Sequence, residues 1–283
     1  MKCCGNCKHE QDSNTDYYCE DCKRFANETD IEKMGVGRMK FENTEVTGFE
    51  NAIIGARLPM CKDLEEAKGK SDTGWIDDGG KDGFYAGDRL DQDSEGGVVK
   101  VIGEKDLDLL KRLINADDKI GQPNSKFLRM IHAQVCITAP LYWWKEMDTY
   151  KVGTTANSTS TMHRIANYPI TMDCFEMDDF DNYVTVTNNN FDQDCINFIW
   201  GDVIRICEEL RQKYNKTKDK RYWKELIRLL PESWLQTRMF DCDYATLRNI
   251  YCWRVKIPHK LTEWKQFGDW VKSLPSAKEL IIN

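Results

Sequence analysis

Residues 139–163 read APLYWWKEMDTYKVGTTANSTSTMH, and the expected fold follows from this stretch. Pro140 can begin a helix, because the first turn of a helix has no partner for the amide hydrogen that proline lacks. The aromatic residues after it belong to that helix, and a dense run of hydroxyl and amide side chains follows from Thr154 to Ser160. Because such side chains hydrogen-bond polar and anionic groups, we expect this run to bind a ligand.

The residues before Pro140 predict a strand. Apolar side chains stand at every second position from Ile131 to Ile137 and alternate with polar ones such as His132, which is the period of a half-buried strand. Residues 41–49 read as a further extended segment. Apolar residues at helical spacing predict helices over 51–57, 105–116, 195–214, 220–230, 244–254 and 260–273. The chain therefore mixes helices with strands.

Two segments are expected to be irregular. Residues 62–100 hold eight of the eighteen glycines, are rich in acidic residues and show almost no apolar periodicity, so we predict a long, flexible insertion. Residues 168–194 are irregular and acidic as well, and residues 183–187 read as a strand or an edge hairpin.

A zinc site is predicted near the start of the sequence. Cys4 and Cys7 form one C-x2-C pair, and Cys19 and Cys22 form a second, which together supply the four thiolates of a structural zinc site. So short a segment cannot bury enough apolar area by itself, so the metal must stabilise it. We expect residues 1–30 to form this zinc-binding segment and residues 38–283 to form the main domain. Unpaired or redox-active thiols are the alternative.

Composition limits the classes of partner. The formal net charge is −7 and the pI is about 5.3, so the chain as a whole repels nucleic acid unless a local basic patch overrides that charge. No run of apolar residues is long enough to span a membrane, and the sequence does not open with a secretory signal. We therefore expect a cytoplasmic protein that binds neither membranes nor nucleic acid.

The polar run resembles the signature of the flavin-dependent thymidylate synthase family. That signature reads Arg-His-Arg, two residues, Ser, one residue, Asn-Glu, one residue, Ser, one residue, Arg-Tyr, and it follows a strand, an Ala-Pro step and a helix. Thr155, Asn157 and Ser160 fall where the family has Ser, Asn and Ser. Residues 150–152, Tyr-Lys-Val, replace the Arg-His-Arg, and residues 162–163, Met-His, replace the Arg-Tyr.

A second block near the C-terminus supports the resemblance. Asn249 and Arg254 match the family residue by residue within a pattern that begins at Leu230-Pro231 and ends at Trp264. The similarity covers most of residues 41–275, without the zinc segment and the insertion.

The resemblance implies an α/β (α+β) domain with a central sheet flanked by helices, assembled as a homotetramer. It implies binding sites for FAD, deoxyuridine monophosphate (dUMP) and a folate where subunits meet. The implied reaction is reductive methylation of dUMP with methylenetetrahydrofolate and reduced flavin, without a protein thiol as nucleophile.

The implied site residues are the hydrogen-bond donors of the two blocks, because anionic ligands require cations and hydroxyls. No catalytic residue is assigned. The expected substrate-binding residues are Asn157, Ser160, His163 and Arg254, and the expected cofactor-binding residues are Lys151, Thr154, Thr155 and Asn249.

Each of these residues also has a structural interpretation. Arg254 could form a salt bridge, Lys151 and Asn157 could belong to turns or helix caps, and His163 could be structural. One of the adjacent residues Trp143 and Trp144 could stack on a ligand while the other fills the core, or both could be core residues. A catalytically inactive protein that binds a nucleotide, or that interacts through its zinc segment, is the alternative to the enzyme.

Overall fold

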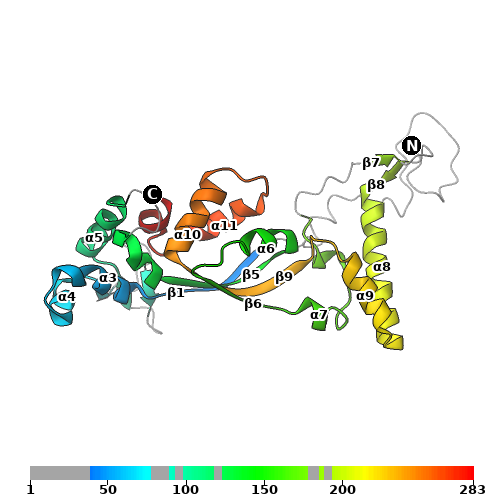
Figure 1. Cartoon of the computed structure of the whole chain (residues 1–283), viewed down its shortest axis with the longest axis horizontal. Coiled ribbons are helices and arrows are strands. Elements are labelled where there is room, and N and C mark those ends of the chain that lie inside the picture. The colour runs from blue at the N-terminus through cyan, green and yellow to red at the C-terminus, as the bar shows by residue number, and fades with distance from the viewer. Residues whose placement is uncertain (1–38, 78–88, 93–97, 118–122, 178–184, 188–192) are drawn as a thin grey trace. The chain divides into compact units, whose positions relative to one another are not determined.

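The computed structural model describes residues 39–77, 89–92, 98–117, 123–177, 185–187 and 193–283, which form two compact units (Figure 1). Of the described residues, unit 1 contains Met39, Thr138–Trp144 and those within Ser158–Thr237. Unit 2 contains those within Lys40–Ile137, Lys145–Asn157 and Arg238–Asn283. The predicted zinc ligands Cys4, Cys7, Cys19 and Cys22 lie outside the described residues. The division into a segment over 1–30 and a main domain over 38–283 stays a prediction.

A four-stranded sheet runs in the order β1-β5-β9-β6. Its strands are β1 (Lys40–Thr47), β5 (His132–Pro140), β9 (Leu235–Asp243) and β6 (Thr154–Ser158). The alternation predicted for β5 is confirmed, because Ile131, Ala133, Val135 and Ile137 are all fully buried. Neither β6 nor β9 was predicted as a strand.

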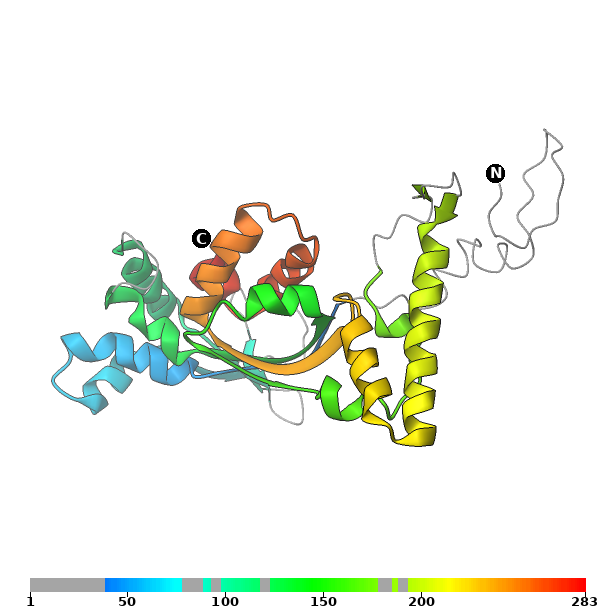
Figure 2. The ribbon, with the colours of Figure 1, turned by 45° about the vertical axis from the view of Figure 1, so that its right-hand side comes forward.

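Unit 2 contains most of the remaining helices, which pack largely on one another. They are α3 (Phe49–Arg57), α4 (Leu64–Lys70), α5 (Glu104–Asn115), α10 (Tyr244–Ile250) and α11 (Glu263–Lys272), with 3-10 turns over Leu58–Met60 (η1) and Pro123–Met130 (η2) and π-helical turns over Tyr251–Lys256 (η4) and Lys278–Ile282 (η5). α10 and α11 lie on the same side of the sheet in both views (Figure 2). Trp270 of α11 stacks on Phe41 of β1 at 5.6 Å between ring centroids and donates to the Thr44 hydroxyl at 3.1 Å. The bounds of α3, α5 and α11 confirm the helices predicted over 51–57, 105–116 and 260–273.

The segment 62–100 contains regular structure that the sequence did not lead us to expect. Helix α4 lies within it, as does an antiparallel sheet of β2 (Gly74–Asp77), β4 (Val98–Val101) and β3 (Arg89–Gln92). Asp63 caps α4 by accepting from the Glu66 amide at 2.9 Å, and Glu66 accepts in return from the Lys62 amide at 2.8 Å. The Asp-x-x-Glu spacing of this helix start resembles a capping box and was a readable sequence signal. Flexibility of the segment stays a prediction.

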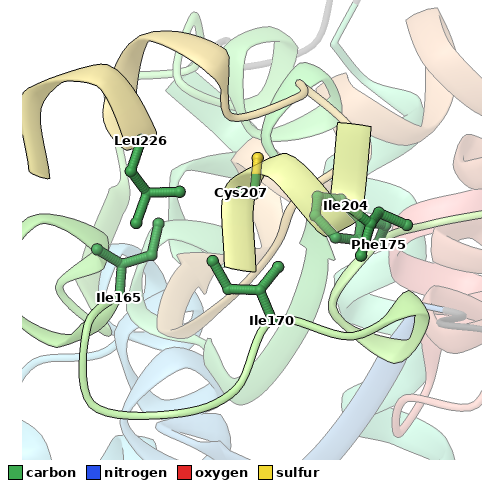
Figure 3. Packing of buried hydrophobic residues seen from close by; sticks show 6 residues of the cluster. All are labelled: Ile165, Ile170, Phe175, Ile204, Cys207 and Leu226. Atoms are coloured by element: carbon green, nitrogen blue, oxygen red, sulfur yellow. The ribbon is translucent and has the colours of Figure 1, made fainter. Parts of the chain in front are cut away.

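Unit 1 has its own core beneath a helical hairpin. α8 (Ile196–Thr217) and α9 (Lys220–Leu229) lie side by side in both views and confirm the helices predicted over 195–214 and 220–230. Figure 3 shows the cluster of buried apolar side chains that they cover: Ile165, Ile170, Phe175, Ile204, Cys207 and Leu226. The remaining elements of unit 1 are α7 (Thr161–Arg164), η3 (Met172–Cys174), β7 (Thr185–Thr187) and β8 (Gln193–Cys195).

The tryptophan pair of α6 (Leu141–Met147) is buried within unit 1. Trp143 and Trp144 are both fully buried, with their rings edge to face at 5.0 Å between centroids. The Trp144 indole donates to the Gln236 carbonyl at 2.9 Å. The idea that one of them stacks on a ligand is therefore wrong, because the short helix buries both rings at once. Within the described part of the chain, no helix is both long and apolar enough to cross a membrane.

Candidate functional site

An open cleft of about 230 Å³ lies in unit 2 at the end of α6. The loop that follows α6, strand β6 and one residue of β9 line it. The lining side chains are Met147, Asp148, Tyr150, Lys151, Thr154, Ala156 and Phe240. The cleft therefore brings together part of the polar run that the sequence singled out.

The loop before β6 is fixed by the start of α10. Gly153 adopts a φ of +73°, a left-handed conformation that favours glycine, and its carbonyl accepts from the Asp243 amide at 3.0 Å. A Cβ at Gly153 would lie 2.1 Å from an Asp243 carboxylate oxygen. The Thr246 hydroxyl donates to the Val152 carbonyl at 3.0 Å. These contacts fix the backbone next to Lys151, which lines the cleft.

Strand β6 divides the predicted ligand-binding residues between its two faces. Thr154 and Ala156 line the cleft, so Thr155 and Asn157 point to the opposite face, because successive side chains of a strand alternate. The Thr154 hydroxyl donates to the Tyr150 carbonyl at 2.5 Å, so it presents only lone pairs to a ligand. Lys151 and Thr154 thus share one site, whereas Thr155 and Asn157 do not reach it.

Arg254 is held by a carboxylate and two aromatic rings. Its Nη2 lies 2.9 Å from Glu146 Oε2, and its Nε donates to the Tyr150 hydroxyl at 3.0 Å. The guanidinium carbon also lies 5.7 Å from the centroid of the Tyr150 ring and 5.5 Å from that of Trp264. Arg254 therefore contacts Tyr150 in the wall of the cleft. Its ion pair with Glu146 is the salt bridge that the structural interpretation anticipated.

The cations around the cleft differ in their partners. Arg238 Nη1 lies 2.7 Å from Asp148 Oδ1, so a carboxylate holds this arginine as well. Lys151 is exposed, and the described residues provide it with no hydrogen bond or ion pair. One uncompensated ammonium group at the cleft fits a single phosphate group on a ligand.

The remaining predicted residues lie away from the lining of the cleft. Ser160 and His163 belong to unit 1, where Ser160 caps α7 by accepting from the His163 amide at 3.2 Å. The Ser160 hydroxyl also lies 2.7 Å from His163 Nδ1. Asn249 is half-buried on α10 and does not line the cleft. Ser160 thus has the local capping contact that serine often makes.

One polar pair was missed because its partners are distant in sequence. His132 Nδ1 on β5 lies 3.0 Å from Asp241 Oδ2 on β9, and both side chains are partly exposed. The alternation of β5 placed His132 on the polar face, but it gave no sign of a partner 109 residues away.

No group of three or more His, Cys, Asp and Glu side chains suited to a metal ion occurs in the part of the chain that the structure describes. Six cysteines in this part, including the buried Cys207 and Cys242, form no disulfide. Burial raises the pKa of Cys242 well above its usual value, which keeps this thiol protonated. The buried Cys207 and Cys242 thus suit packing better than nucleophilic chemistry.

Comparison with known proteins identifies the fold. No family model and no curated protein matches the sequence. The structure matches thymidylate synthase X (ThyX) from Helicobacter pylori with FAD and dUMP, at a TM-score of 0.52 and 14% identity, over 87% of this chain and 97% of that chain. It also matches the UMP/dUMP methylase PolB from Streptomyces cacaoi bound with 5-Br dUMP, at a TM-score of 0.50 and 12% identity, over 86% and 94%. The predicted fold class is confirmed: the chain has a ThyX-like fold that combines helices and strands.

Proposed function

We propose that this chain, which has the fold of the flavin-dependent thymidylate synthases, is a divergent enzyme that reductively methylates dUMP. Methylenetetrahydrofolate would supply the carbon, and reduced FAD would supply the hydride. The observation that carries the proposal is the extent of the match, which spans 87% of this chain and 97% of the ThyX chain with FAD and dUMP. A fold match alone does not establish chemistry, so the proposal depends on the site as well.

The cleft in unit 2 is the proposed position of the nucleotide phosphate. Lys151 supplies an ammonium group, and the Gly153 turn and the start of α10 fix the backbone beside it. The ring of Tyr150 forms part of the wall and offers a surface for a base. A cation for the phosphate and an aromatic ring for the base are the two features that support this position.

The same residues do not fit the diphosphate of FAD in addition to a nucleotide phosphate. Arg238 and Arg254 lie near the cleft, but each is paired with a carboxylate at less than 3 Å. Among the described residues that line the cleft, Lys151 is the cation without a carboxylate partner. We therefore propose a homo-oligomer, with a tetramer as the first expectation, in which a second copy completes the FAD site. In such shared sites Asn157, Ser160 and His163 stay the proposed substrate-binding donors, and Thr155 and Asn249 stay the proposed cofactor-binding donors.

The ion pairs of Arg238 and Arg254 favour a second function, nucleotide binding without catalysis. Glu146 and Asp148 neutralise guanidinium groups beside the cleft, and Tyr-Lys-Val stands at residues 150–152, where the family has Arg-His-Arg. This loss of cationic charge favours a catalytically inactive protein that retains one nucleotide site.

The visible absorbance spectrum of the purified full chain separates these functions. Yellow protein whose flavin absorbance shifts when dUMP is added supports the enzyme. Colourless protein that binds dUMP supports the inactive nucleotide-binding protein. Absence of both flavin and dUMP binding contradicts both functions. Lys151→Gln should weaken dUMP binding, whereas Lys126→Gln, which removes an exposed charge elsewhere in unit 2, should not.

A further inference from the structure

The hairpin of α8 and α9 carries a concentration of positive charge that the net charge of the chain conceals. Residues 211–228 contain eight Lys and Arg against two Asp and Glu, in a chain whose formal net charge is −7. Charges more than about 10 Å away are largely screened at about 0.1 M salt, so the local excess governs what approaches this end of unit 1. This is the local basic patch that could override the acidic balance.

Five lysines in this stretch have no carboxylate partner within the described residues. The two acidic residues are already engaged, because Asp219 pairs with Arg221 at 2.6 Å and Glu225 pairs with Arg228 at 2.5 Å. The unpaired lysines are all exposed: Lys213, Lys216, Lys218, Lys220 and Lys224. Two of these form cation–π contacts, Lys213 with Tyr222 and Lys218 with Tyr214. We call this set the hairpin lysines.

The helices present these lysines on their outer surface. Lys220, Lys224 and Arg228 recur every four residues and so line one side of α9 over about 12 Å. Leu226 is fully buried on the other side, in the core shown in Figure 3. Lys218 lies in the turn between the helices with a φ of +56°.

An exposed aromatic residue lies in the loop beside the hairpin lysines. The Ala166 carbonyl accepts from Arg211 Nη1 at 3.1 Å and from Asn215 Nδ2 at 2.7 Å, so the loop is fixed against the end of α8. Tyr168, two residues later, is 59% exposed. The guanidinium carbon of Arg164 lies 5.4 Å from the centroid of the Tyr168 ring.

We propose that the hairpin lysines, with Arg164 and Tyr168, bind single-stranded nucleic acid. Lysines without carboxylate partners can neutralise phosphates and release counterions, and an exposed ring beside them can stack on a base. This activity is additional to the proposed reaction on dUMP and does not depend on it.

An anionic membrane is the weaker partner for this surface. An amphipathic helix that lies in a membrane surface inserts its apolar face, but the apolar face of α9 already packs on the core of unit 1 through Leu226 and Ile227. Binding to a membrane would therefore rest on charge alone. Leu229 is the one apolar residue of α9 that is exposed. Charge without an apolar face fits a polyanion in solution better than a bilayer.

Fluorescence anisotropy with the full chain and a labelled single-stranded oligodeoxynucleotide tests the proposal. Binding should weaken as salt rises, because single strands give a slope of log affinity against log salt of about −0.7 per neutralised phosphate. The triple variant Lys216→Gln, Lys220→Gln, Lys224→Gln should reduce the magnitude of this slope by about 2. Tyr168→Ala should weaken binding at least about fivefold and leave the slope unchanged.

The matched control is the triple variant Lys105→Gln, Lys126→Gln, Lys265→Gln, which removes the same charge from exposed positions in unit 2. An equal loss of oligonucleotide affinity in both triple variants would overturn the proposal, because binding would then depend on the net charge of the chain and not on the hairpin lysines. Competition by excess dUMP would also overturn it by placing the oligonucleotide at the cleft. Binding to vesicles containing phosphatidylserine without binding to the oligonucleotide would reassign the surface to membranes.

Discussion

Arg254 Nη2 and Glu146 Oε2 lie 2.9 Å apart, which joins the π-helical turn after α10 to α6. The arginine that the family resemblance assigns to a nucleotide is thus paired with a carboxylate of its own chain. If Arg254 contacts a nucleotide phosphate, that phosphate must compete with Glu146.

The change Glu146→Gln tests this competition. It should strengthen dUMP binding about two- to fivefold, because a partly exposed ion pair contributes about 0.5 to 1 kcal/mol. Isothermal titration calorimetry gives the affinity, and Glu65→Gln on α4 is a control with the same loss of charge. An unchanged affinity together with a lower unfolding temperature would assign the pair a structural role.

Asp106 should be the most sensitive charged position of unit 2. Its side chain is fully buried and accepts hydrogen bonds from Arg57 Nε at 2.6 Å, Ser71 Oγ at 2.6 Å and Thr73 Oγ1 at 2.7 Å. Asp106→Ala should lower the free energy of unfolding by about 3 to 5 kcal/mol, because Arg57 loses its partner. Urea denaturation measures this loss. Asp108→Ala, an exposed neighbour on α5, should change stability by less than about 0.5 kcal/mol, and equal effects would contradict this account.

Glu208 should make the stability of unit 1 depend on pH. Hydrogen bonds from Arg211 lower the pKa of Glu208 from 4.5 to about 2, although partial burial opposes that shift. Between these values the unfolded chain holds a proton that the folded chain lacks, so stability falls as the pH drops from about 4.5 towards 2. At neutral pH, Glu208→Gln should cost about 1.5 to 3 kcal/mol.

Urea denaturation at neutral pH and at about pH 3 checks this prediction. Glu208→Gln should have a smaller loss of stability on acidification than the unchanged chain. Glu209→Gln, whose exposed pair with Arg205 contributes little, should retain the full loss. The same acid dependence in all three proteins would exclude Glu208 as its source.

The cysteine pairs of residues 1–30 predict one bound zinc ion per chain. Cys19→Ser should remove the metal and unfold this segment while the rest of the chain keeps its unfolding temperature. Metal analysis and thermal denaturation measure the two effects, with Cys3→Ser as the control because Cys3 lies outside both pairs. Zinc retained by Cys19→Ser would refute the proposed ligand set.

The periodicity of apolar residues predicted those helices and strands that bury one face. The alternation from Ile131 to Ile137 predicted β5, because one face of that strand is buried. β6 was not predicted, because Thr154–Ser158 has no apolar alternation and its strand neighbour in the sheet, β9, begins only at Leu235. Strand formation there depends on tertiary pairing, which local propensity does not report.

The candidate site was predictable in composition but not in geometry. The polar run pointed to Lys151 and Thr154, which line the cleft. The sequence did not reveal that Thr155 and Asn157 point away from the cleft, because β6 was not recognised as a strand with alternating side chains. The carboxylate that holds Arg254 is distant in sequence, so only the fold could reveal the pair.

The most direct test of the central claim is mass spectrometry of dUMP after incubation with the full chain, FAD, methylenetetrahydrofolate and reduced nicotinamide. The proposed enzyme should convert dUMP to thymidine monophosphate, and Lys151→Gln should slow that conversion. No thymidine monophosphate from protein that binds both FAD and dUMP would contradict the proposed reaction.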